Sequence, residues 1–223
     1  MVKVAAAELE QENKTAYHVE AVTPRIPFGF AFVKRASDIL VSLLVATLGF
    51  LPMLVIAVLI KLDSEGPVIF KQERLGKDGK PFTMYKFRSM RLQTVEDEAK
   101  GWTVKNDPRV TGIGKFMRKT SIDELPQLIN ILKGDMSFVG PRPLIPQETE
   151  IRELREKYNV FSVRPGITGW AQVNGRNSIT WEDKFRYDVW YVRNISFILD
   201  VKILFKTAVT VLKRDNVYTN EEE

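Results

Sequence analysis

One long apolar stretch dominates the pattern of hydrophobic and polar positions. Residues 39–60 carry no charged side chain, and about 20 such residues are enough to cross a bilayer as a helix. Pro52 lies inside the stretch, with Lys34 and Arg35 before it and Lys61 after it. Because basic flanks favour the cytoplasm and proline kinks a helix, the pattern predicts a re-entrant membrane helix that is broken at Pro52.

Two other structures are open for this stretch. A single-pass anchor can tolerate a proline, since prolines occur in membrane helices. A buried helix of a soluble core fits less well, because core helices seldom stay free of charge over this length.

The pattern after the apolar stretch predicts a β-hairpin followed by helices. Residues 68–75 and 82–88 read as strands around Gly76-Lys77-Asp78-Gly79, a typical turn sequence. Alternation places Lys86 and Arg88 on one face of the second strand. Helical patterns cover residues 113–119, 125–133, 147–158, a segment from Thr180, and 197–214. The last is amphipathic, and fits either the membrane interface or the domain core.

These elements predict an α+β fold with a simple domain order. Residues 1–31 form an N-terminal tail or lead-in, and 32–62 form the re-entrant membrane helix. Residues 63–215 form a small cytosolic, mainly helical catalytic domain with a short β-hairpin and interfacial amphipathic helices. Residues 216–223 form a C-terminal tail.

Composition narrows the partners and the chemistry. The net charge of +5 favours an anionic partner, and we expect no nucleic acid because no nucleic-acid-binding motif is visible. The chain has no cysteine, and its single histidine, His18, lies in the polar N-terminal stretch. An enzyme of this composition would use carboxylates, hydroxyls, lysines or tyrosines. Any metal would be a hard cation such as magnesium, bound by oxygen.

The sharpest candidate for chemistry is the pair Asp123-Glu124. Pro126 is tolerated in the first turn of a helix but not in its interior, so the pair belongs at a helix start. Adjacent residues do not share a helix face, so the two carboxylates can serve different atoms. The structural alternative, which is compatible with this one, is a capping box formed by Ser121 and Glu124.

Two further sets of residues are candidates for binding phosphate. Pro141 and Pro143 stiffen the loop that presents Arg142, whose guanidinium can bind phosphate in a bidentate manner. Lys86 and Arg88 form a possible phosphate clamp on one strand face. The Pro-Arg-Pro loop could instead be only a rigid turn. Lys86 and Arg88 could instead lie on an exposed strand face without binding phosphate.

The order of motifs carries a resemblance that no single motif does. The chain contains, in this order, KRASD, the proline-broken apolar run, KLDSEGPVIFKQERLGKDGKPFTMYKFRSM, NDPRVTGIGKFMRKTSIDELPQLINILKGDMSFVGPRP, RPGITGWAQVNGRN and DVWYVRN. In content and spacing it resembles a small monotopic phosphoglycosyl transferase of the bacterial sugar transferase family, over about residues 32–215.

The resemblance implies a reaction and its residues. Such enzymes transfer a sugar 1-phosphate from a UDP-sugar to polyprenyl (undecaprenyl) phosphate and release UMP. By resemblance, Asp123 is the nucleophile that forms an aspartyl-phosphosugar intermediate, and it lies near the required Mg²⁺. Glu124 is associated with proton transfer or with supporting the metal and acceptor, while Pro141, Arg142 and Pro143 lie by the nucleotide. A helix N-terminus should help to keep Asp123 ionised.

Further residues are assigned to substrate binding and to the membrane anchor. Lys86, Arg88, Arg164, Asn174 and Arg176 are candidates for substrate binding. Lys34, Arg35, Asp38 and Pro52 are assigned to the membrane anchor, the first three at the membrane surface. The family often has serine before the proline, where this chain has Leu51.

The expected location and the competing functions complete the prediction. We expect the bacterial inner membrane, with the catalytic domain on the cytoplasmic leaflet; a homodimer is compatible with the sequence. A membrane-bound phosphohydrolase would use the same carboxylates with water as acceptor. A non-catalytic scaffold of a glycan assembly complex would need neither carboxylate.

Overall fold

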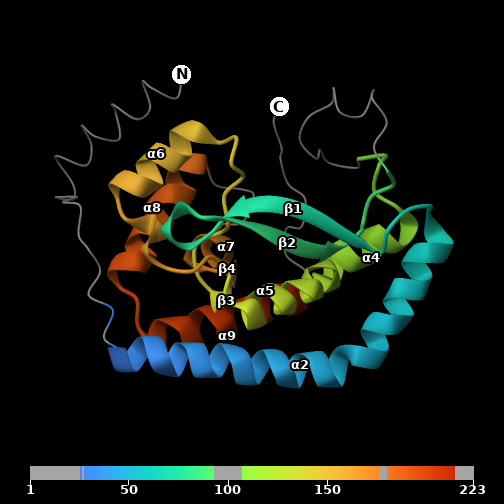
Figure 1. Cartoon of the computed structure of the whole chain (residues 1–223), viewed down its shortest axis with the longest axis horizontal. Coiled ribbons are helices and arrows are strands. Elements are labelled where there is room, and N and C mark those ends of the chain that lie inside the picture. Colours follow the sequence, from blue (N-terminus) through green and yellow to red (C-terminus); the bar gives the residue numbers. More distant parts are fainter. Residues whose placement is uncertain (1–25, 27, 93–106, 176–179, 214–223) are drawn as a thin grey trace.

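The computed structural model describes residues 26, 28–92, 107–175 and 180–213 (Figure 1). Its elements are the helix α2 (Phe28–Asp63), the strands β1 (Ile69–Leu75) and β2 (Pro81–Phe87), the helix α4 (Gly112–Thr120), the 3₁₀ helix η2 (Ile122–Gln127), α5 (Leu128–Lys133), β3 (Ser137–Val139), α6 (Thr149–Lys157), β4 (Gly166–Thr168), α7 (Trp170–Asn174), α8 (Trp181–Arg193) and α9 (Phe197–Lys213), with short 3₁₀ turns η1 (Lys77–Gly79) and η3 (Val160–Ser162). This mixture of helices and small sheets confirms the α+β class.

The predicted hairpin is confirmed. β1 and β2 pair antiparallel, with Ile69 opposite Phe87 and Leu75 opposite Pro81. Asp78 and Gly79 in the turn both have positive φ, 58° and 69°, a conformation that this Asp-Gly sequence tolerates.

A second, small sheet was not predicted from the sequence. β3 and β4 pair in parallel, with Ser137 opposite Gly166 and Val139 opposite Thr168. The backbones are so close that a Cβ on Gly166 would lie 2.2 Å from the amide nitrogen of Gly140. A three-residue strand carries too little alternation to be recognised from sequence.

The apolar helix α2 packs along the domain by one narrow stripe. Asp38, Ser42, Ile56 and Ile60 are buried at helical spacing, while large apolar side chains on the other faces, such as Leu48 at 73 % exposure, are open. In Figure 1 the helix follows one edge of the molecule and then changes direction toward its C-terminal end. Residues 29–63 are long and apolar enough to cross a membrane; a re-entrant course through one stays a prediction.

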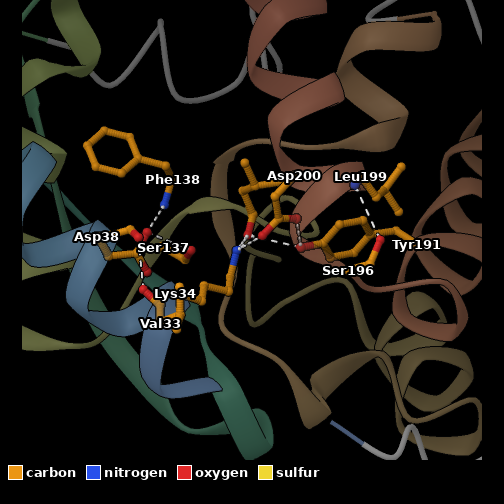
Figure 2. Close-up of polar contacts among 11 residues, drawn as sticks. Val33, Lys34, Asp38, Ser137, Phe138, Tyr191, Ser196, Leu199 and Asp200 are labelled. Carbon is orange, nitrogen blue, oxygen red and sulfur yellow. Dashed lines mark hydrogen bonds and ion pairs between the residues drawn. The ribbon is translucent and has the colours of Figure 1, made fainter. Parts of the chain in front are cut away.

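The three polar residues assigned to the membrane surface are bound by the domain, and their place at a membrane surface stays a prediction. Lys34 Nζ lies 2.5 Å from Asp200 Oδ2 and also donates to the Val139 carbonyl (Figure 2). Asp38 is buried and accepts from the Ser137 hydroxyl and the Phe138 amide. The Arg35 guanidinium donates to main-chain carbonyls at the end of α5. These side chains therefore dock the start of α2 onto the domain.

The last helix, α9, has two distinct apolar faces. Leu199 and Ile203 are buried in the largest core cluster, together with residues from β3 and α8. The predicted amphipathic face is another one, and it is exposed; its members include Phe197, Ile198, Val201, Leu204 and Phe205, at 43–81 % exposure. Packing on the core and an open apolar face are thus both present on one helix.

Candidate active site

The Asp123-Glu124 pair lies at the start of η2, as predicted, with Pro126 in the same short helix. The predicted capping box is wrong. Ser121 has φ 57° and ends α4, and its side chain makes no capping hydrogen bond to η2. A main-chain bond from the Glu124 amide to the Ser121 carbonyl, 3.2 Å, closes the turn instead.

The buried carboxyl of Asp123 is acted on by the charges of two cations. Burial raises its pKa, and the neighbouring Glu124 raises it further, while the charges of Lys86 and Arg118 oppose the shift. Arg118 is held in place by a 2.8 Å hydrogen bond from its Nε to the Ser89 hydroxyl. The direction is opposite to that expected from a helix N-terminus, because desolvation outweighs the short helix.

Glu124 forms a direct ion pair with the same lysine. Its carboxylate lies 2.7 Å from Lys86 Nζ, and both side chains are mostly buried. The two adjacent carboxyls of η2 therefore share Lys86, and only Glu124 is paired with it directly.

A small surface pocket brings several of the predicted residues together. Its lining includes Arg74, Lys86, Glu124, Gln127, Arg142 and Pro143. β2 contributes the lysine, η2 contributes the glutamate, and the loop after β3 contributes the arginine and proline. The pocket therefore joins Glu124 to the Pro-Arg-Pro loop, while Asp123, the next residue in η2, is not part of its lining.

The Pro-Arg-Pro loop is held through its carbonyls. The Pro141 carbonyl accepts from the Gly166 amide at 2.9 Å, the Arg142 carbonyl from Arg155 Nη1 at 2.7 Å, and the Pro143 carbonyl from Arg74 Nη1 at 3.1 Å. Proline has no N–H to donate, so these outside donors fix the loop.

Positive charge accumulates around Arg142, whose side chain is exposed. Burial and the nearby Arg142 lower the pKa of Arg74 to about 10, although Glu148 opposes the shift. Burial and Arg142 likewise lower the pKa of Lys184 on α8. A bound anion would stabilise the charged forms of Arg74 and Lys184, so this end of the pocket suits a phosphate or diphosphate.

Other predicted site residues lie elsewhere. Arg88 is buried and donates to the carbonyls of Ile60, in the last turn of α2, and of Ser64 and Glu65 just after it, so it does not form a clamp with Lys86. Arg164 donates to the Gly134 carbonyl at the end of α5. Asn174 accepts from Lys206 of α9. Arg176 lies outside the described residues.

Several residues of the site were missed from the sequence. These are Arg74, Gln127, Arg118, Arg155, Lys184 and Asp188. The clearest signal was on α8, where Lys184 and Asp188 stand at i,i+4 spacing among aromatic residues, a spacing that puts both on one face.

The candidate donors for a hard cation at this site are the carboxylates of Asp123 and Glu124. Among the described residues, no group of three or more histidine, cysteine, aspartate or glutamate side chains gathers in one place. Magnesium usually keeps several waters and is bound by one or two carboxylates together with substrate phosphates. Asp123 and Glu124, beside a cationic pocket, fit that mode.

Comparison with known proteins identifies the family. The bacterial sugar transferase family model matches residues 30–214, and the chain belongs to this family. The resemblance expected from the motifs is thereby confirmed.

Named relatives show how far the likeness extends. The chain is 47 % identical over 189 residues to the "uncharacterized sugar transferase EpsL" of Bacillus subtilis, covering 83 % of this chain and 90 % of that protein. It is 41 % identical over 201 residues to the undecaprenyl-phosphate galactose phosphotransferase of Salmonella typhimurium (84 % of this chain, 42 % of that protein). It is 46 % identical over 183 residues to the UDP-glucose:undecaprenyl-phosphate glucose-1-phosphate transferase of Escherichia coli (79 % and 39 %). The chain thus spans less than half the length of these two transferases.

Proposed function

We propose that this protein transfers a sugar 1-phosphate from a UDP-sugar to undecaprenyl phosphate and releases UMP. The observation that carries the proposal is Asp123, a buried carboxyl acted on by the charges of Lys86 and Arg118. Its neighbour Glu124 lines a pocket together with Arg142. The family and the printed names of the relatives support the same donor and acceptor.

The reaction proceeds in two displacements at one phosphorus. An oxygen of ionised Asp123 attacks the phosphorus that carries the sugar, the bond from that phosphorus to the oxygen bridging to UMP breaks, and UMP leaves with the bridging oxygen. An oxygen of undecaprenyl phosphate then attacks the same phosphorus and the bond to Asp123 breaks. Such a covalent intermediate splits one difficult transfer into two easier steps.

Each neighbouring residue has a role that its position supports. Lys86 and Arg118 favour the charged form of Asp123 and balance charge on the transferring phosphoryl group. Arg142, with Arg74 and Lys184 nearby, binds the phosphates of the nucleotide. Glu124, oriented by Lys86, takes the remaining proton from the acceptor phosphate.

A magnesium ion completes this site in the proposal. Bound by Asp123, with Glu124 in support, it would neutralise charge on the diphosphate and on the departing UMP. Asp123 would then act both as the nucleophile and as a metal ligand, and its position relative to Glu124 would affect both roles.

The proposed membrane placement rests on how α2 is docked. Asp38 contacts β3 near one end, while Asp63 at the other end accepts from the Ile113 amide of α4. A straight helix from Asp38 to Ile60 extends about 33 Å, which is about the thickness of the hydrocarbon core. Both ends hold the same folded domain, and a polar domain does not enter hydrocarbon. We therefore propose a re-entrant course for α2, α9 at the interface, and the domain on the cytoplasmic leaflet.

The decisive experiment measures UMP release by the detergent-solubilised protein. A panel of UDP-sugars is tested with magnesium, with and without undecaprenyl phosphate, for the wild type and Asp123→Asn. Asp78→Asn is the matched control, because Asp78 is exposed in the hairpin turn. We expect lipid-dependent UMP from at least one sugar, normal rates in Asp78→Asn and none in Asp123→Asn. Steady turnover without lipid would favour a phosphohydrolase. Glycan assembly that survives Asp123→Asn would favour a non-catalytic scaffold.

A further inference from the structure

A buried ion pair outside the pocket is connected to its arginine. Arg155 of α6 and Asp188 of α8 meet at 2.5 Å, with only 8 % and 2 % of their side chains exposed. The other terminal nitrogen of the same guanidinium, Nη1, donates to the Arg142 carbonyl at 2.7 Å. One planar side chain thus joins α8 to the Pro-Arg-Pro loop.

We propose that Arg155, oriented by Asp188, is a positioning residue that sets where the Arg142 side chain meets the nucleotide phosphates. The inference rests on the proposed function, since it names residues that act through Arg142 on the same substrate. Neither Arg155 nor Asp188 lines the pocket, so their effect is exerted through the backbone of the loop.

The chemistry of the loop makes this contact important. Pro141 and Pro143 supply no N–H on either side of Arg142, and the carbonyls of all three residues accept hydrogen bonds from donors outside the loop. Two of these donors, Gly166 and Arg74, hold the flanking prolines. Of the three donors, Arg155 holds Arg142, whose exposed side chain lines the pocket. A displacement of about 1 Å at a phosphate contact is enough to weaken a charge-assisted bond substantially.

Arginine at position 155 suits its two contacts, one with the Asp188 carboxylate and one with the Arg142 carbonyl. A guanidinium has separate donors in a rigid fork and can bind a carboxylate and a carbonyl together. Lysine keeps the charge that Asp188 needs, but its ammonium is a compact group on a flexible stem. Arg155→Lys therefore retains the ion pair and removes the fixed link to Arg142, whereas Arg155→Ala leaves Asp188 buried without a partner and threatens folding.

The test is a double-substitution cycle on the full-length protein in detergent. Equilibrium binding of UDP and the KM for the UDP-sugar are measured for the wild type, Arg155→Lys, Arg142→Ala and the double variant. Arg152→Lys is the matched control, because Arg152 lies on the same helix in an exposed pair with Glu156. Thermal unfolding is recorded for every variant.

If Arg155 acts through Arg142, Arg155→Lys weakens UDP binding and raises KM about tenfold, as for loss of a charge-assisted contact. The same change has no further effect once Arg142 is alanine. Arg152→Lys is expected to behave as the wild type. Additive effects of the two substitutions, or unchanged UDP binding in Arg155→Lys, would overturn the inference about Arg155.

The proposed function is judged separately, by sugar turnover of the wild type. If the wild type binds UDP but turns over no sugar, the binding cycle still decides the inference about Arg155. Wild-type protein that binds no UDP would overturn the inference and the proposed function together.

Discussion

Lys86 on β2 and Glu124 on η2 form a 2.7 Å ion pair at the edge of the pocket, and the same lysine acts electrostatically on the buried carboxyl of Asp123. A single cation thus serves two adjacent acids with different surroundings. Removing its charge should change both, which makes Lys86 the most direct probe of the site.

The pH dependence of the first displacement should report on Lys86. Attack requires ionised Asp123, so the rate falls as the pH drops through its pKa. Burial raises that pKa and Lys86 lowers it, so Lys86→Met should move the acid limb of the pH–rate profile to higher pH. We expect a loss of activity at neutral pH of about a hundredfold, since two groups are affected. UMP release over a range of pH measures both effects.

Two further variants test this explanation. Lys86→Arg preserves the charge and should keep the acid limb near its wild-type position. Lys80→Met removes an exposed lysine of the same hairpin and should leave the profile unchanged. An acid limb that stays in place in Lys86→Met would show that another group controls it.

Asp188 should make stability depend on pH between about 4 and 6. Burial raises its pKa from 3.8 to about 6, although Arg155 pulls it down. The folded state therefore holds this proton more tightly than the unfolded state. Its contribution to the free energy of unfolding is full below pH 4 and is lost as the pH rises through 6. As the pH rises from about 4 to 6, we expect the Tm of Asp188→Asn to fall less than the Tm of the wild type.

The comparison with a neighbouring acid isolates Asp188. Burial also raises the pKa of Asp123 and Asp200, so the wild-type curve alone does not assign the effect. Asp183→Asn alters an exposed carboxylate on the same helix and should follow the wild type. Parallel melting curves for the wild type and Asp188→Asn would contradict the prediction.

Local patterns predicted the elements of this fold well. The hairpin, the charge-free helix and the start of η2 each follow from short-range signals, such as Asp78-Gly79 in a turn or Pro126 in a first turn. The Asp123-Glu124 pair was found in the same way, because a helix start is encoded within a few residues.

The contacts that complete the site join distant residues and escaped prediction. The sequence around Asp38 does not indicate that its carboxylate accepts a hydrogen bond from the Phe138 amide of β3, about a hundred positions later. Arg88 shared a strand pattern with Lys86, yet it turns to the end of α2 once the strand has ended. The sequence pattern predicts Arg155 to be an exposed charged residue of a surface helix. It is the packing of α6 against α8 that buries it beside Asp188.

Docking of α2 should depend on the ion pair between Lys34 and Asp200. Both side chains are mostly buried, and Tyr191 donates a further hydrogen bond to Asp200. Lys34→Met leaves the carboxylate without its cation, which for a buried pair costs about 3–5 kcal/mol. We expect a clear fall in Tm in detergent, measured beside Lys61→Met at the other end of α2. Equal melting temperatures for the two variants would contradict this account.

The course of α2 through the membrane can be decided by cysteine labelling, because the chain has no native cysteine. Ala31→Cys and Leu62→Cys place single thiols at exposed positions near the two ends of the helix. A re-entrant helix predicts that a membrane-impermeant maleimide labels neither variant in intact spheroplasts and both in inverted vesicles. Leu51→Cys, exposed on the helix beside Pro52, should resist labelling in both preparations because it lies in hydrocarbon. Labelling of one terminal position from outside the cell would establish a single pass, and the domain contacts at both ends of α2 would then need another explanation.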